Sequence, residues 1–465
     1  MSLERSSTSS FDEKDGSAIA EPATAAVSRR TWFRTSFFQI TIVGLCAFLS
    51  PGLWNSMNSL GAGGGQSPFL ANAANSIVFG LMVLTCLLGS TITNKLSYRW
   101  ALVLGACGYA PYAGGLVLNL KTGASWLVYL GSVTCGLSAG LFWSVEGAIA
   151  LGYPEENKRG RYLSYWLAWR NGGQILGGAI SLGLNAKGNK IGAIGRETYY
   201  VFIALQAFAP FVAVLLSNPP QVQRKDRTPV KMENHIGLKA ELKEVWDTLT
   251  RREVLWLVPV SLFAQWPSSY VNTFFSLYFT VRARALGSLL IAILSVIGNV
   301  LLGFWLDNKR VSKKIKTRVA FVGLMTIFGG VFIWLTILQT RFLKHKPKLD
   351  WTDGRAFSEA FGAYVIFYIV YYTLQNVLYY IFSELARNPK ELIRLSSILR
   401  GAESAGSACG YGVSARKVLP MTVPLGIDFG LWGVAFAAAM FTVKDVGTKW
   451  ELNKDVKEEK EDEAH

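Results

Sequence analysis

Long apolar runs follow one another along most of this 465-residue chain and constrain its fold more than any other feature. A run of roughly 20 apolar residues crosses a bilayer as a helix, whose backbone groups are all bonded within the segment. The runs fall near residues 37–57, 70–93, 100–120, 125–151, 162–184, 199–217, 253–280, 285–306, 318–338, 357–384, 395–415 and 422–443. We therefore predict an all-α polytopic membrane protein with about 12 transmembrane helices.

A long polar segment divides these runs into two groups of six, which predicts two pseudo-symmetric six-helix halves. We expect an N-terminal half at 36–217, a cytoplasmic linker at 218–252 and a C-terminal half at 253–443. The remaining segments, 1–35 and 444–465, are polar and lack an apolar run, which is typical of disordered tails. Within the linker, residues 238–249 have the pattern of an amphipathic helix on the membrane surface.

The positive charge of the chain, a formal net +16, lies mostly in short loops between the apolar runs. Basic clusters precede the first run and follow the second, fourth, sixth and eighth runs. Because basic loops stay on the cytoplasmic side of a membrane, we expect both termini to be cytoplasmic. The segment Arg341 to Lys348 is an exception, since it falls on the opposite side. No nucleic-acid partner is expected, because no soluble domain carries a basic face with interleaved aromatic residues.

The cysteines and histidines give no sign of a metal or redox site. All five cysteines lie inside apolar runs, and the three histidines are scattered in polar segments. This placement is typical of thiols that pack like small apolar residues. We expect no metal and no cofactor.

Two charged residues, Glu146 and Arg170, stand in the middle of neighbouring apolar runs that a short polar turn connects. A charge at bilayer depth costs at least about 2.5 kcal/mol, so such residues normally face a cavity or a partner. The two are either a buried ion pair that locks two helices or a proton or substrate site. Gln174 shares a helical face with Arg170, which favours the wall of a polar cavity. We predict that Glu146 lies in this cavity and exchanges a proton, with Arg170 as its partner.

The second group of runs carries two further charges, Arg400 and Glu403, in the eleventh run. They are one helical turn apart, so they either neutralise each other or form the counterpart of Glu146 and Arg170. Both alternatives remain open at the level of the sequence.

A short pattern recurs at equivalent points of the two halves. Residues 90–99 read STITNKLSYR and residues 303–310 read GFWLDNKR. In each, a small residue that allows close helix packing precedes an amide or acid by four positions, and basic residues follow. We predict two gating loops, one at Asn94, Lys95 and Arg99 and the other at Asp307, Lys309 and Arg310.

This repeat resembles the loop motif of the major facilitator superfamily, in degenerate form in the first half. Further stretches resemble the uncoordinated-93-like family, in particular its fungal branch, at 58–66 (NSLGAGGGQ), 146–149 (EGAI), 153–157 (YPEEN), 278–286 (YFTVRARAL) and 400–406 (RGAESAG). The chain departs from the pattern at Glu403, where that branch is expected to have glutamine, and at Ser97, where it is expected to have glycine. The resemblance implies a major facilitator fold but no particular substrate.

The resemblance also implies which helices line a central cavity. Asn55 and Asn272 lie on the first and seventh spans, which line the cavity in the superfamily. They either bond neighbouring helices or contact a ligand. In the tenth span we place Tyr372 and Gln375 in the cavity.

We therefore expect a secondary transporter that moves a small molecule or ion across a membrane by alternating access, with the substrate between the halves. The alternative that the family resemblance leaves open is a non-transporting regulator or trafficking escort of a channel or receptor. We do not expect an enzyme, because no Ser-His pair, histidine cluster or nucleotide loop is present. The expected partners are the lipid bilayer, the substrate and, under the alternative, another membrane protein.

Overall fold

The structure, a computed structural model, describes residues 31–65, 67–155, 158–187, 189, 191–226, 228–230, 238–387 and 389–447. These residues form helices joined by short connections, with only two isolated β-bridges. The N-terminal half contains α1 (Ser36–Ala47), α2 (Leu53–Ser59), α3 (Pro68–Leu96), α4 (Tyr98–Cys107), α5 (Tyr109–Thr122), α6 (Trp126–Gly152), α7 (Arg159–Asn185) and α8 (Arg196–Val214). The C-terminal half contains α10 (Arg252–Leu255), α11 (Val258–Gln265), α12 (Ser268–Tyr278), α13 (Val281–Leu306), α14 (Lys313–His345), α15 (Arg355–Leu385), α16 (Pro389–Ser414) and α17 (Thr422–Val443).

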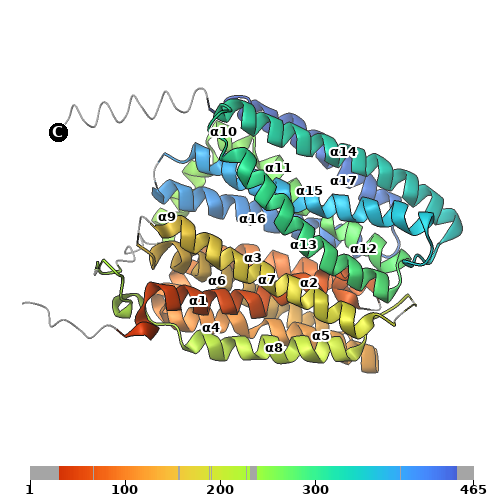
Figure 1. Ribbon diagram of the computed structural model, residues 1–465, viewed down its shortest axis with the longest axis horizontal. Helices are drawn as coiled ribbons and strands as arrows, with labels where there is room; N and C mark the ends of the chain where they lie inside the picture. The colour runs from red at the N-terminus through yellow and green to blue at the C-terminus, as the bar shows by residue number, and fades with distance from the viewer. Residues whose placement is uncertain are drawn as a thin grey trace, which may run out of the picture.

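The two halves lie side by side, with the N-terminal half below and the C-terminal half above in Figure 1. The long helices run roughly along the horizontal axis of the view. We call the end where α1 begins and α17 ends, on the left, the proximal end, and the opposite end the distal end. The predicted all-α architecture of two six-helix halves is confirmed. The predicted tails, apart from residues 31–35 and 444–447, lie outside the described residues.

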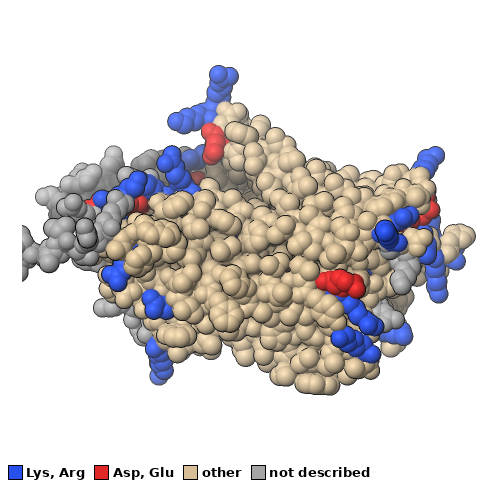
Figure 2. Space-filling model, turned by 60° about the horizontal axis from the view of Figure 1, so that its bottom comes forward, with Lys and Arg blue, Asp and Glu red and all other residues tan. Residues whose placement is uncertain are grey.

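Among the described residues, nine helical segments are long and apolar enough to cross a membrane. The three further spans that complete the predicted twelve are α7, the pair α11 and α12, and α16. Polar and charged side chains such as Arg170 and Arg400 make α7 and α16 less apolar than the other spans, whereas α11 and α12 are each too short because the helix is broken at Pro267. In the face shown in Figure 2, charged residues gather toward the two ends and a broad uncharged band lies between them. This distribution is that of a protein whose middle faces lipid.

The first and seventh spans are each broken near their middle by a proline. In the first span, Pro51 lies in a π-helical turn, Phe48–Gly52, that separates α1 from α2. In the seventh, Pro267 stands between α11 and α12. Proline cannot donate the helical hydrogen bond and clashes with the preceding turn, so it breaks or widens a helix. Both breaks occur beside the polar residues that face the cavity described below.

Close helix approach at two glycines sets the position of the central polar residues. A Cβ added at Gly173 of α7 would overlap the carbonyl oxygen of Phe48 in the π-helical turn. A Cβ added at Gly406 of α16 would overlap the carbonyl oxygen of Leu262 in α11. Only glycine allows backbones to approach this closely, as is common between membrane helices. These contacts fix α7 beside the first span and α16 beside the seventh.

The linker between the halves is partly anchored at the proximal end. Its first part follows the N-terminal half, where Arg224 donates hydrogen bonds to the carbonyl oxygens of Gly152 and Tyr153. The predicted amphipathic segment forms α9 (Leu238–Leu249). Val245 of this helix packs against the core of the C-terminal half, whereas the Trp246 side chain is exposed. Residues 231–237 lie outside the described part of the chain.

Candidate functional site

A cavity of about 250 Å³ lies between the two halves. Helices of both halves form its wall, and most of its lining side chains carry hydrogen-bonding groups. Its volume is just below the roughly 300–1,000 Å³ that is usual for small-molecule sites. Seven of the nine predicted cavity residues line it, namely Asn55, Arg170, Gln174, Asn272, Tyr372, Gln375 and Arg400. Glu146 and Glu403 are fully buried behind the lining and are not part of the cavity wall.

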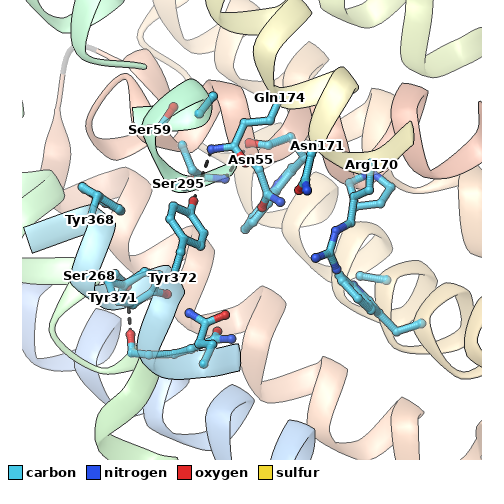
Figure 3. A pocket seen from close by; sticks show the side chains of 18 of the residues that line it. Asn55, Ser59, Arg170, Asn171, Gln174, Ser268, Ser295, Tyr368, Tyr371 and Tyr372 are labelled. Carbon is cyan, nitrogen blue, oxygen red and sulfur yellow. Dashed lines mark hydrogen bonds between the residues drawn. The ribbon is translucent and has the colours of Figure 1, made fainter. Parts of the chain in front are cut away.

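Arg170 extends from α7 toward the cavity (Figure 3), and two indole rings lie against its guanidinium. Its guanidinium lies 5.1 Å from the ring centroid of Trp143 in α6 and 5.7 Å from that of Trp166, one turn earlier in α7. Such cation–π contacts contribute about 0.5–2 kcal/mol each, more where water is excluded. Within the described part of the chain, the Arg170 side chain forms no hydrogen bond or ion pair.

The direct ion pair between Glu146 and Arg170, one of the two sequence-based alternatives, is not formed in this structure. Glu146 Oε2 instead accepts a hydrogen bond from the Trp166 indole nitrogen at 3.2 Å. Its Oε1 has no hydrogen-bond partner among the described residues. The titratable and charged groups that face the carboxyl are Cys46 of α1, Tyr109 of α5, and the two arginines of α7 and α16. Trp166 therefore contacts both Glu146 and Arg170, although the two side chains form no ion pair with each other.

Arg400 and Glu403 of α16 form the ion pair that their spacing allows, with 3.1 Å between Nη1 and Oε2. Gln265 of α11 donates a second hydrogen bond to the same carboxylate oxygen at 3.3 Å. The Arg400 guanidinium also lies 4.2 Å from the ring centroid of Trp143. The indole of Trp143, which belongs to the N-terminal half, is thus in contact with an arginine from each half.

Side-chain amides supply much of the remaining polar lining. Gln174 donates a hydrogen bond to the Tyr372 hydroxyl across the two halves, drawn dashed in Figure 3. Asn272 donates to the Tyr411 hydroxyl and accepts from the Tyr368 hydroxyl. Five other lining amides form no side-chain hydrogen bond within the described residues, namely Asn55, Asn171, Asn299, Gln375 and Asn376. The cavity therefore offers unused donors and acceptors to a ligand.

Hydrogen bonds that join the two halves gather at the distal end. Ser59 of α2 bonds Ser288 of α13 at 2.6 Å. Asn72 of α3 donates to Thr273 of α12 at 2.7 Å. Arg284, which is fully buried in α13, donates at 2.6 Å to the carbonyl oxygen of Gly192 in the α7–α8 connection. These bonds hold the two halves together at the distal end.

The predicted gating loops lie at the proximal end. In the first, Arg99 donates from Nε to the carbonyl oxygen of Leu216 at 2.5 Å, and Lys95 is exposed. The backbone of Asn94 ends α3, but its side chain lies outside what the structure describes. In the second loop, Asp307 caps the C-terminal end of α13, and the side chains of Asp307, Lys309 and Arg310 are exposed.

Several lining residues were missed by the sequence interpretation. Trp143 was missed because a tryptophan inside an apolar run is not distinguished from a packing residue. Asn171, Asn299 and Asn376 carried a usable signal, since each is an amide in the middle of an apolar run. The buried Asp428 of α17 carried the same signal, although it does not line the cavity.

Comparison with known proteins identifies the family. Residues 35–408 match the family model of the Major Facilitator Superfamily. The chain belongs to the major facilitator superfamily. A protein of Aspergillus versicolor named "Notoamide biosynthesis cluster protein O'" is 38% identical over 426 residues, covering 91% of this chain and 92% of that protein.

Relatives within the superfamily confirm the predicted resemblance to the uncoordinated-93-like family. A UNC93-like protein of Schizosaccharomyces pombe is 26% identical, covering 86% of this chain and 83% of its own. UNC93-like protein 1 of Arabidopsis thaliana is 27% identical, covering 88% of this chain and 90% of its own. Each of these relatives thus matches more than four fifths of this chain.

Solved structures with this fold are membrane transporters. A D-xylose-proton symporter has a TM-score of 0.58 at 15% identity and covers 89% of this chain and 98% of its own. A POT family transporter in complex with 5-aminolevulinic acid has a TM-score of 0.61 at 13% identity and covers 88% and 96%. This likeness shows the fold. Together with the family match, the long apolar helices make the chain an integral multi-pass membrane protein.

Proposed function

We propose that this protein is a secondary transporter that moves a small molecule or ion by alternating access between its two halves. The observation that carries the proposal is the polar cavity, which both halves line and which contains the unpaired Arg170 and unbonded amides. A protein that only escorts another membrane protein has no need of such a lining. The biosynthetic-cluster name of the Aspergillus relative adds support for a small-molecule cargo.

The distal hydrogen bonds between the halves correspond to one end-state of the alternating-access cycle. Rocking of one half against the other would break bonds such as Ser59–Ser288 and open the distal end. We propose that the distal end is extracytoplasmic and that both termini are cytoplasmic, because the basic loops lie at the proximal end. Tags at both termini should then resist protease in sealed cells, and one accessible terminus contradicts this orientation.

The two proximal loops take part in switching under this proposal. Asp307 is exposed at the end of α13 and makes no contact with the cavity lining. The substitution Asp307→Ala should therefore slow transport several-fold without changing which substrates compete. A changed substrate preference at normal protein level would place Asp307 in the binding site instead.

Uptake into proteoliposomes tests the proposal directly. The purified full chain should accumulate at least one compound from a panel of labelled metabolites, and Arg170→Gln at equal protein level should reduce that uptake. Empty liposomes are the control. If no panel member is taken up while the protein purifies with a stoichiometric membrane-protein partner, the escort function replaces the transporter.

A further inference from the structure

The charged side chains that line the cavity are both cations, Arg170 and Arg400. The nearest carboxylates, Glu146 and Glu403, are fully buried and lie outside the cavity wall. A cleft with low-dielectric walls concentrates the field of the charges that line it. The sign of the lining charge therefore restricts the class of ligand.

Arg400 does not offer its full charge to a ligand, because Glu403 holds it in an ion pair at 3.1 Å. Arg170 forms no ion pair with a described residue, and the rings of Trp143 and Trp166 lie against its guanidinium. A guanidinium has five N–H donors in a planar fork that matches a carboxylate with two parallel hydrogen bonds. In Arg170 this fork is unused.

Both arginines lie against the same ring, within 5.1 Å of the Trp143 centroid. Two cations held this close repel each other, and in the low dielectric of a membrane protein that repulsion is weakly screened. An anion at the Arg170 fork offsets the repulsion as well as forming hydrogen bonds. The indole faces keep the guanidinium in place while leaving its N–H edge free.

We propose that Arg170 is the anion-binding residue of this cavity and that the substrate is a small organic anion, such as a carboxylate. That the bound anion is the transported substrate rests on the proposed transport function. That Arg170 binds an anion does not, because binding is measured separately from transport. Asn171 and Asn55, which Figure 3 shows beside Arg170, hydrogen-bond polar groups on the body of the anion. The tyrosines on the opposite wall, such as Tyr371 and Tyr372, contact its apolar part.

The test uses ligands that share one body and differ in charge. Benzoate, benzamide and benzylamine form one series, and their hydroxylated derivatives form a second series that engages the amides. Saturable thermal stabilisation of the full chain in nanodiscs is measured at constant ionic strength. The carboxylate of at least one series should bind roughly 10- to 100-fold more tightly than its amide, which is the loss expected for charge-assisted hydrogen bonds. The amine should bind most weakly.

Substitutions test whether Arg170 causes the preference for the carboxylate. Arg170→Gln should remove the preference for the carboxylate, and Arg170→Lys should retain part of it, because lysine keeps the charge but not the fork. The matched control is Arg341→Gln, an exposed arginine outside the cavity, and it should leave the preference unchanged. If Arg170→Gln does not fold, the charge series on the unmodified protein tests whether the cavity prefers an anion, and Arg170→Lys, which keeps the charge, assigns the residue by a reduced preference.

Three results would overturn the assignment: equal or tighter binding of the amide or the amine, no saturable binding of any carboxylate, or an unchanged preference in Arg170→Gln. Binding and transport can fail separately. Carboxylate binding without uptake would contradict the transport function and support the anion site. Uptake of a neutral or cationic compound that is unchanged in Arg170→Gln would contradict the anion site and support the transport function.

Discussion

Two sets of central charges, Arg400 with Glu403 in the C-terminal half and Glu146 with Arg170 in the N-terminal half, are arranged differently. In the C-terminal half, Arg400 pairs with Glu403 on the same helix, and Arg282 pairs with Asp350 at the distal end. In the N-terminal half, Glu146 and Arg170 lie on neighbouring helices, yet neither forms an ion pair with a described residue. Indole rings contact them instead.

This difference separates charges that hold the structure from charges that are available for chemistry. A buried charge without an ion pair lowers stability unless a ligand or a proton completes its environment. A protein retains such a charge where function requires it, and this favours Glu146 and Arg170, of which Arg170 lines the cavity, as the residues that carry binding and coupling. The contrast predicts unequal effects of equivalent substitutions.

The largest effect on stability is expected at Glu403. Glu403→Gln removes the partner of Arg400 and leaves a guanidinium in the low-dielectric interior, a loss of about 3–5 kcal/mol by analogy with buried pairs in soluble proteins. The folded yield and the unfolding midpoint in detergent measure it. The double substitution Arg400→Gln with Glu403→Gln should recover most of the loss.

A surface pair supplies the control for this substitution. Arg341 and Glu359 form an ion pair at 3.1 Å, but both side chains are solvent-accessible. Glu359→Gln should change stability by less than about 0.5 kcal/mol, because exposed pairs contribute little. If Glu403→Gln is as mild as Glu359→Gln, the ion pair of α16 is not structural and the contrast between the halves fails.

The second effect concerns Asp350, in the connection between α14 and α15. Hydrogen bonds from Arg282 hold the pKa of this carboxyl well below its usual range, assisted by the hydroxyl groups of Thr280 and Thr352, whereas partial burial opposes the shift. Because the folded pKa is depressed, the stabilisation is fully present above the unfolded pKa of about 3.9 and is lost as the pH falls below it.

The substitution Asp350→Asn removes this contribution at neutral pH. We expect a loss of about 1–2 kcal/mol, the lower range for charged hydrogen bonds, since solvent screens a pair at the end of the bundle. Unfolding midpoints measured between pH 7 and pH 3.5 should fall for the unmodified protein below about pH 4 and converge toward those of the variant. If the unfolding midpoints of the two proteins change with pH in parallel, the Asp350 carboxylate does not contribute this stability and other contacts hold the connection between α14 and α15.

Much of the architecture was predictable because a bilayer restricts the choices. Apolar length gave the spans, and polar interruptions such as Arg170 and Gln375 identified the cavity faces of their helices. The contacts between side chains of different helices could not be predicted. Nothing in the spacing of Glu146 and Arg170 indicates that Trp166 bonds the carboxyl in place of the arginine, since that depends on rotamers and on helix rotation set by packing.

A departure from the family pattern was informative. Serine stands at position 97, where glycine was expected, and the structure gives Ser97 φ 74° and ψ 157°, a region that essentially only glycine adopts. Arg310, which aligns with it in the C-terminal repeat, has no positive φ. The unusual backbone conformation of Ser97 could be found only in the structure.

The third effect, smaller and of opposite sign, follows from this strain. Ser97→Gly relieves a backbone cost of about 1–3 kcal/mol but adds roughly 0.5–1 kcal/mol of unfolded-state entropy. We expect a net gain near 1 kcal/mol, seen as a higher unfolding midpoint. Arg310→Gly at the aligned position should instead lower stability, and equal responses at both sites would show that the two loops do not differ in strain.

Among the buried sites, the smallest effect on stability is expected at Glu146, although its expected effect on transport is large. Glu146→Gln keeps an oxygen that accepts the Trp166 hydrogen bond and removes no ion pair. Stability should therefore change by less than about 1 kcal/mol, in contrast to Glu403→Gln. If Glu146 carries the coupling proton, uptake driven by a pH gradient should be lost in the variant, while exchange of labelled for unlabelled substrate survives. Loss of both modes would assign Glu146 to substrate binding, and retention of both would leave it without a role in coupling. A stability loss as large as that of Glu403→Gln, recovered by adding Arg170→Gln, would instead show that Glu146 and Arg170 form a structural pair like that of the C-terminal half.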